Sequence, residues 1–146
     1  MCESRRNEMI RAGLQALHFG GQEVPTSPLV LAYVGDAVHE LAVRTHLALQ
    51  GDALVRSLHE RAAAQVQAGA QAKVLQKLEP QLTDEERDLI RRARNTKAQV
   101  PRSATVFEYR YSTAFEALLG HLFLTGAWDR LLVILEAALA QGEART

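Results

Sequence analysis

Apolar residues recur every three to four positions through most of the chain, which is the spacing of helices that bury one face. No alternation of apolar and polar residues continues long enough to indicate a strand. The expected helices cover residues 28–50, 52–79, 83–95, 105–124 and 128–141, with a weaker helical signal at residues 3–17. We therefore predict an all-α protein.

Several helix boundaries are marked by residues that start or stop helices. Ser27 and Pro28 suit the N-cap and the first position of a helix, and Gly51 suits the position after its end. Asp52 can cap the next helix, in which Gly69 marks either a break or a close contact. The helix expected at residues 83–95 opens with the capping-box sequence TDEE at residues 83–86.

The composition is that of a folded domain. Of the 146 residues, 47% are hydrophobic and 23% are charged, which is too apolar for disorder and enough for a core. We expect one domain over residues 1–146, with residues 1–26 as a short helix or a partly disordered segment. Cys2 is the single cysteine, which excludes a disulfide framework or a thiolate zinc site within one chain. No membrane span or secretory signal is indicated, so we expect a cytoplasmic location.

The charges balance overall but are unevenly distributed. Lysine plus arginine and aspartate plus glutamate each number 17, so the net charge at pH 7 is +0. Between residues 91 and 110 the only acid is Glu108, and the cations are Arg91, Arg92, Arg94, Lys97, Arg102 and Arg110. A neutral protein with one basic segment can hold phosphates on one face. The alternative is a solvated helix end and loop, whose arginines interact favourably with the negative end of the helix dipole.

Two carboxylates lie in apolar helical stretches where an ordinary core would not place them. Asp36 stands in LAYVGDAVHEL and Glu116 in STAFEALLGHLFL. Removing an ionised carboxylate from water is costly unless something compensates its charge. Mg²⁺ is one such compensator, because it binds one or two carboxylates together with water and phosphate oxygens. The basic segment directly precedes the Glu116 helix, which is an arrangement that suits a phosphodiesterase.

The surroundings of Asp36 leave two interpretations open. The buried stripe of this helix is expected at Leu31, Val34, Val38, Leu41 and Thr45, which puts Asp36 beside the core. Gly35 costs a helix about 1 kcal/mol relative to alanine, which indicates close approach of another helix or a ligand. The alternative is an exposed aspartate on a half-buried helix. Glu40, one turn later, either supports the site or is solvated.

Small residues also surround Glu116, and its own alternative is structural. It could accept a hydrogen bond from Ser112 or from an arginine of another helix instead of binding a metal. Other catalytic patterns fail, because the His39-Glu40 pair lacks the second histidine of H-E-x-x-H. The five histidines show no ligand spacing, and the chain has no Walker loop and no recognisable Ser/His/Asp order.

These two helices resemble the acidic motifs of ribonuclease III. LAYVGDAVHEL is similar to the family's signature helix, which is close to LEFLGDAVL, and STAFEALLGHLFLTG is similar to its second acidic helix, close to ADAFEALIGAIY. The segments LHERAAAQVQAGAQAKVL, RRARNTKAQVP and YRYSTAFEALLG, without a double-stranded-RNA-binding domain, resemble the Mini-ribonuclease III group. The resemblance covers roughly residues 28–135.

The resemblance implies the endonuclease-domain fold of ribonuclease III, a helical bundle that forms a homodimer. It implies that Asp36 and Glu116 are catalytic and bind Mg²⁺, with Mn²⁺ as an alternative ion. Two other acidic positions of full-length ribonuclease III are Ala32 and Thr113 here, which resembles the Mini group. The protein would then offer few metal ligands, and water and RNA phosphate would complete the shell.

The implied activity is metal-assisted hydrolysis of double-stranded RNA, with two sites in a valley between two protomers. The family's usual substrate is the precursor of large-subunit (23S) ribosomal RNA, and a large-subunit ribosomal protein bound to that RNA is an expected helper. For RNA binding we predict phosphate contacts from Arg94, Lys97, Arg102 and Arg110, and contacts to 2′-hydroxyls from Asn95 and Thr96.

Two other functions stay open at this point. The replacements at Ala32 and Thr113 motivate a non-catalytic RNA-binding or ribosome-associated module on the same fold. An all-α nucleotide pyrophosphohydrolase also uses helical acids and Mg²⁺. Such enzymes, however, need denser E-x-x-E carboxylate pairs on facing helices than this chain shows near Asp36 and Glu116.

Overall fold

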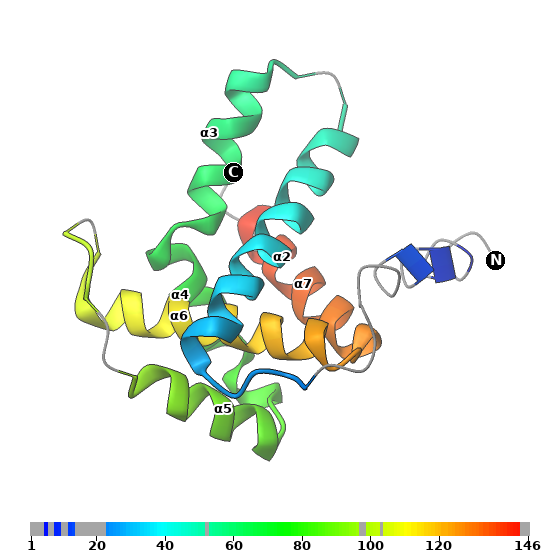
Figure 1. The fold of residues 1–146 in the computed structure, drawn as a ribbon. Coiled ribbons are helices and arrows are strands. Elements are labelled where there is room, and N and C mark those ends of the chain that lie inside the picture. Colours follow the sequence, from blue (N-terminus) through cyan, green and yellow to red (C-terminus); the bar gives the residue numbers. More distant parts are fainter. Residues whose placement is uncertain are drawn as a thin grey trace.

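The computed structural model describes residues 5, 8–9, 12–13, 23–51, 53–96, 99–102 and 104–143. Within these ranges there is no strand, and the elements are α2 (Pro28–Leu49), α3 (Val55–Val66), α4 (Ala68–Leu78), the short 3₁₀ helix η1 (Glu79–Gln81), α5 (Asp84–Arg94), α6 (Val106–Leu124) and α7 (Trp128–Glu143) (Figure 1). The all-α prediction is confirmed. Most of residues 1–26 lie outside the described ranges, as does Asp52. None of the described helices is both long and apolar enough to span a membrane.

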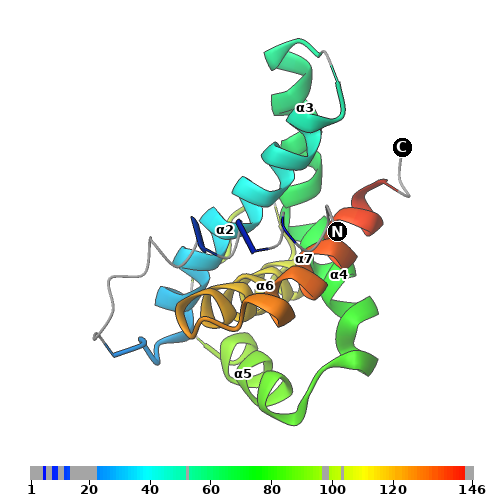
Figure 2. The ribbon, with the colours of Figure 1, turned by 90° about the vertical axis from the view of Figure 1, so that its right-hand side faces the viewer.

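Helix α6 forms the centre of the molecule. It packs against α2, α4, α5 and α7, which surround it in both ribbon views (Figures 1 and 2). Its buried side is almost continuous, and Phe115, Leu118 and Leu119 are fully buried. The main core is therefore built around α6, the helix that carries Glu116.

The end of α2 and most of α3 form a helical hairpin that projects from this core (Figures 1 and 2). A second, small cluster of Val43, Leu47 and Ala62 holds the two helices of the hairpin together. Large apolar side chains near its tip stay exposed, including Leu49 at 81% and Leu54 at 80%. The hairpin thus presents apolar surface to its surroundings.

Most predicted boundaries are confirmed, and two are wrong. Helix α3 begins at Val55 with Leu54 in the N-cap position and no side-chain cap. The helical region predicted for residues 52–79 breaks at Gln67, where the backbone is extended (φ −65°, ψ 154°). Gly69, at which the sequence indicated either a break or a close contact, lies two residues after this break, and a β-carbon there would make only an ordinary contact, 3.5 Å from the Glu108 carboxyl. The break redirects the chain so that α4 can pack on α6.

The predicted stripe on α2 is wrong over its second half. Leu31 is buried as expected, but Leu41 is 59% exposed and Thr45 is also exposed. The buried side consists of Leu31, Ala32, Gly35, His39, Val43 and Leu47. Hydrophobicity suggested a face of large residues, whereas the close packing of α6 selects the face that carries the smallest side chain, Gly35.

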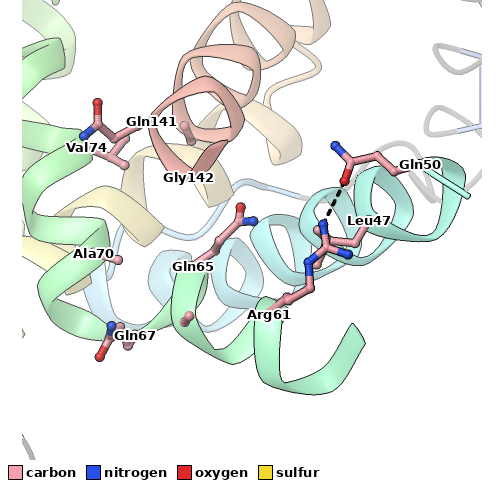
Figure 3. A pocket seen from close by; sticks show the side chains of 11 residues that line it. Leu47, Gln50, Arg61, Gln65, Gln67, Ala70, Val74, Gln141 and Gly142 are labelled. Carbon is pink, nitrogen blue, oxygen red and sulfur yellow. Dashed lines mark hydrogen bonds between the residues drawn. The ribbon is translucent and has the colours of Figure 1, made fainter. Parts of the chain in front are cut away.

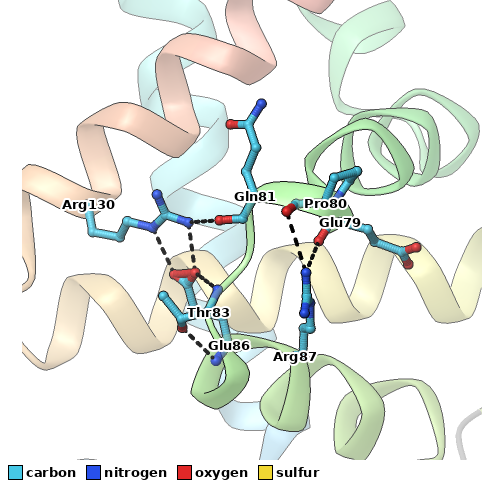
Figure 4. Close-up of polar contacts among 7 residues, drawn as sticks. All are labelled: Glu79, Pro80, Gln81, Thr83, Glu86, Arg87 and Arg130. Atoms are coloured by element: carbon cyan, nitrogen blue, oxygen red, sulfur yellow. Dashed lines mark hydrogen bonds and ion pairs between the residues drawn. The ribbon is translucent and has the colours of Figure 1, made fainter.

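The start of α5 is fixed by a capping box and by an ion pair from α7. The Thr83 hydroxyl accepts from the Glu86 amide, and the Glu86 carboxylate accepts from the Thr83 amide at 3.0 Å. Arg130 adds two bonds to the same carboxylate, at 2.8 and 3.0 Å (Figure 4). Burial by itself raises the pKa of Glu86, but the bonds and charge of Arg130 and the bonds of Thr83 outweigh it and lower that pKa.

Replacing Arg130 with methionine should lower the free energy of unfolding by about 2 kcal/mol at pH 7, because the buried Glu86 carboxylate loses its counter-ion. A carboxyl whose pKa is lowered by folding stabilises the protein above its ordinary pKa of 4.5, and this contribution is lost as the pH falls. The cost of Arg130→Met should therefore shrink at pH 4. Urea unfolding of the natural protein and of Arg130→Met at pH 7 and pH 4 measures this loss of unfolding free energy. An equal cost at both values would show that Arg130 acts through packing alone.

Candidate active site

The helices that carry the two predicted carboxylates touch backbone to backbone. A β-carbon added at Gly35 on α2 would lie 1.6 Å from the carbonyl oxygen of Glu116. One added at Gly120 on α6 would lie 1.9 Å from the carbonyl oxygen of Leu31. No side chain fits at either position, so the close approach indicated by Gly35 is that of a helix.

This crossing brings together carboxyl groups that are 80 residues apart in sequence. Asp36 follows Gly35 directly, and Glu116 is the residue whose carbonyl Gly35 contacts. The Asp36 side chain is exposed and that of Glu116 is half-buried. Asp36 therefore lies beside the core, as predicted, but next to a second acid.

Glu116 is strongly perturbed by this environment. Burial raises its pKa from 4.5 to about 8, with further contributions from the charge of Asp36, from a hydrogen bond to Asp36 and from the charge of Glu40. Two carboxyl groups in contact resist being ionised together, so the site retains a proton well above the ordinary range. A cation between them would remove the conflict.

Glu40 adds negative charge at the edge of this pair. It forms an ion pair with Arg44 on the next turn of α2, at 2.8 Å, while its side chain stays 35% exposed. It contributes to the raised pKa of Glu116, yet no group of three or more metal-binding side chains exists among the described residues. The dense carboxylate cluster of a pyrophosphohydrolase is therefore missing from the part of the chain that the structure describes.

The structural alternative for Glu116 receives no support from its neighbours. The hydroxyl of Ser112 donates to the carbonyl oxygen of Tyr109 at 2.9 Å, so its hydrogen is not available to the glutamate. Ala32 and Thr113, the two positions at which the sequence resemblance implies acids in full-length ribonuclease III, are both 8% exposed. Small side chains thus line the site where further carboxylates would stand.

A buried histidine on α2, His39, contacts two neighbouring helices. The Nδ1 atom of His39 is 2.9 Å from the Gln71 amide nitrogen on α4, which donates to it, and its ring packs edge-on against Phe115. Burial lowers the pKa of His39 to about 4, although the charge of Glu40 acts in the opposite direction. His39 therefore stays neutral and joins α2 to α4 and α6.

The basic segment is partly neutralised by contacts within the protein. Arg91 and Arg92 both pair with Asp88, at 2.6 and 3.4 Å. Arg94 is half-buried and donates to the hydroxyl of Tyr111 on α6 at 2.7 Å. The guanidinium group of Arg94 has five N–H donors, so it can still contact a phosphate while bound to Tyr111.

The other predicted RNA-binding residues differ in how exposed they are. Arg102, Arg110 and Asn95 are exposed. The hydroxyl of Thr96 donates to the carbonyl oxygen of Arg92 at 2.9 Å, which leaves its oxygen as an acceptor only. Lys97 lies outside the described residues. The exposed cations Arg102 and Arg110 flank the first turn of α6, and Arg110 precedes Glu116 by six residues, or just under two turns of helix.

A separate hollow of about 480 Å³ lies between α2, α3, α4 and α7 (Figure 3). Its polar lining includes Gln50, Gln65 and Arg61, and Arg61 donates to the Gln50 side chain at 2.9 Å. Gln50 follows Asp36 by 14 residues, or about 21 Å of helix rise. The hollow is therefore distinct from the carboxylate site.

Two residues of the site have only faint signals in the sequence. Gly120 is visible as a small residue in an apolar helix, but its pairing with Gly35 requires the crossing of α2 and α6. Tyr111 gives no signal at all, because its contact with Arg94 joins residues that are 17 positions apart. Both emerge from the packing of α6.

Comparison with known proteins identifies the family of this chain. The sequence model of the Ribonuclease III domain family matches residues 29–127. The chain is 49% identical over 112 residues to the Mini-ribonuclease 3 of Symbiobacterium thermophilum, covering 76% of this chain and 86% of that protein. It is 53% identical over 105 residues to the Mini-ribonuclease 3 of Gloeobacter violaceus, covering 72% and 76% respectively.

A solved structure shows the same fold. The crystal structure of a protein from Fusobacterium nucleatum superposes with a TM-score of 0.72 at 33% sequence identity, over 78% of this chain and 92% of that one. The matching family and the identity to these relatives extend over most of the chain. The chain therefore belongs to the ribonuclease III family and is an endoribonuclease of its Mini-ribonuclease 3 group.

Proposed function

We propose that this endoribonuclease hydrolyses double-stranded RNA with Mg²⁺ held by Asp36 and Glu116, and that Mn²⁺ can replace Mg²⁺. The observation that carries the proposal is the contact between these two carboxyl groups at the crossing of α2 and α6, where the pKa of Glu116 is raised to about 8. A pair of acids in this state favours a bound cation. Its position beside an exposed basic segment favours a phosphodiester substrate.

The residues present fit a magnesium ion. The donors are carboxylate oxygens, which Mg²⁺ prefers, and two of them match its habit of keeping several water and phosphate ligands. The ion would supply Lewis-acid activation of the phosphodiester and of the attacking water. The exposed Asp36 would face the substrate, while the half-buried Glu116 would fix the position of the ion from within α6.

The basic segment would orient the RNA. Arg94, Lys97, Arg102 and Arg110 are the proposed phosphate contacts, and Asn95 and Thr96 the proposed contacts to 2′-hydroxyl groups. RNA duplexes are recognised mainly by shape, phosphates and 2′-hydroxyls, because side chains cannot enter their narrow major groove. Such contacts select double-stranded RNA without reading its sequence.

An exposed apolar stripe on α2 supports a homodimer. It comprises Leu29, Val30, Tyr33, Ala37 and Leu41, of which Tyr33 is 81% exposed. A stripe on one helix can pair with its own copy across a two-fold axis. Asp36 lies next to this stripe, so a dimer formed there would place two sites near each other, one for each RNA strand.

The proposed biological substrate is the precursor of 23S ribosomal RNA, in the cytoplasm, with a large-subunit ribosomal protein on that RNA as the helper. This part of the proposal rests on the family relationship. One alternative function is a non-catalytic RNA-binding or ribosome-associated module with the same fold. It is motivated by Ala32 and Thr113, which stand where further acids were expected.

Cleavage of a labelled RNA duplex with and without Mg²⁺ tests the proposal. We expect Mg²⁺-dependent products from the natural protein, and a loss of at least about 100-fold in rate for Asp36→Asn with binding retained. Asp84→Asn, which changes an exposed aspartate at the start of α5, is the matched control and should cut normally. Binding of several duplexes without any product would favour the non-catalytic module.

A further inference from the structure

An exposed aromatic ring stands at the first turn of α6. The side chain of Phe107 is 48% exposed, and its ring stacks on that of Tyr111 with centroids 4.2 Å apart and an interplanar angle of 31°. The ring of Tyr111 is tilted against that of Phe107 and contacts one side of it. Nearly half of the Phe107 side chain remains open to solvent.

The ring is held in a fixed position. The first turn of α6 is closed by a capping box between Thr105 and Glu108, so Phe107 sits on regular helix. Tyr111 is anchored by the hydrogen bond from Arg94, whose guanidinium carbon lies 5.1 Å from the centre of the tyrosine ring. We call Phe107, Tyr111 and Arg94 the aromatic stack.

Cations outnumber acids around the aromatic stack, where the one nearby acid, Glu108, is engaged in the capping box with Thr105. Arg94 belongs to the aromatic stack, and the exposed Arg110 follows Phe107 by three residues on the same helix, which places it on a neighbouring position of the helix surface. A free aromatic face favours a planar ring, and the cations favour an anion. A nucleotide combines both properties.

We propose that the exposed face of Phe107 stacks on an unpaired nucleotide of the RNA substrate. The inference rests on the proposed function and deepens it, because it specifies the substrate class as a duplex with a bulged, looped or terminal unpaired nucleotide. Paired bases in a regular RNA helix are already stacked on each other and cannot meet the ring. Phe107 precedes Glu116 by nine residues, so the unpaired nucleotide would lie about 13 Å from the carboxylates along α6.

Binding measurements on two matched RNAs test this proposal. One fluorescent duplex is fully paired, the other carries a single unpaired nucleotide, and both are titrated in EDTA so that no cleavage occurs. Phe107→Leu keeps an apolar side chain but removes the aromatic face, and should weaken binding of the interrupted duplex about tenfold. Binding of the paired duplex should change by less than about twofold, and Phe107→Trp should retain tight binding of both.

The control is Val133→Ala on α7, which alters an apolar side chain with the same 48% exposure and should change neither affinity. Equal losses on the two RNAs, or no loss on either, would overturn the stacking proposal. So would dissociation of a dimer by Phe107→Leu in sedimentation, since the ring would then be a subunit contact. If the natural protein bound neither RNA in EDTA and cut neither when Mg²⁺ is added, the proposed function itself would fail, which is a different result.

Discussion

Glu116→Gln is expected to make the metal-free protein more stable at pH 8 and to abolish cleavage of duplex RNA. The two effects have one cause, the half-buried carboxyl whose pKa is raised to about 8, first by burial and then by Asp36. Between pH 4.5 and 8 the folded protein holds a proton that the unfolded chain has lost, so stability falls as the pH rises through this interval. Glutamine is neutral and removes this cost, which we put at about 1–3 kcal/mol at pH 8.

Urea unfolding in EDTA at pH 5 and pH 8 measures the first effect. The free energy of unfolding of the variant should exceed that of the natural protein at pH 8. The difference should nearly vanish at pH 5, where Glu116 is protonated. Added Mg²⁺ should raise the melting temperature of the natural protein and leave that of Glu116→Gln nearly unchanged.

The matched control for this variant is Glu60→Gln, on the surface of α3, which changes a 71% exposed carboxylate paired only loosely with Arg56 at 3.5 Å. It should show neither the pH-dependent gain nor the loss of cleavage. If Glu116→Gln were destabilised at pH 8, or still cut RNA at the natural rate, the assignment of Glu116 as a crowded metal ligand would be wrong.

Gly35→Ala should destabilise the protein by about 3 kcal/mol or more and remove activity with it. The new methyl group would overlap the backbone carbonyl of Glu116, at 1.6 Å, and a backbone cannot rotate away as a side chain can. The helices α2 and α6 would have to separate, which would disturb both the core and the spacing of Asp36 from Glu116. Gly120→Ala should behave in the same way, since its new β-carbon would lie 1.9 Å from the carbonyl oxygen of Leu31.

Gly69→Ala provides the control, because it makes the same chemical change inside a helix without an overlap. A β-carbon there meets the Glu108 carboxyl at 3.5 Å, an ordinary contact, and alanine favours helix over glycine by about 0.5–1 kcal/mol. Gly69→Ala should therefore be neutral or slightly stabilising. Thermal unfolding of the three variants ranks them, and a stable Gly35→Ala protein would contradict the close crossing of α2 and α6.

Much of the helical architecture follows from local signals in the sequence. Pro28 and the capping box at residues 83–86 mark the starts of α2 and α5, and glycines with positive φ, Gly51 and Gly126, follow the ends of α2 and α6. These signals act between residues a few positions apart, so they can be read without the fold. The break at Gln67 has only an ambiguous signal, Gly69 two residues later, because the position of the break depends on the packing of α4 on α6.

The buried face of α2 could not be read correctly from hydrophobicity. Leu41 looks like a core residue and is 59% exposed, whereas His39 looks polar and is 2% exposed. Burial of His39 depends on Gln71, a residue 32 positions away that supplies its hydrogen bond. A polar residue is buried where a partner satisfies it, and that partner is chosen by the fold.

The sequence by itself determined the all-α class, most helix boundaries and the two acids that stand in apolar helices. It also marked Gly35 as a point of close approach. Only the tertiary structure decided what approaches it, because Gly35 and Glu116 are 81 residues apart in sequence. That crossing, and not either motif alone, raises the pKa of Glu116, since a carboxyl group responds to the charge and burial that surround it in space.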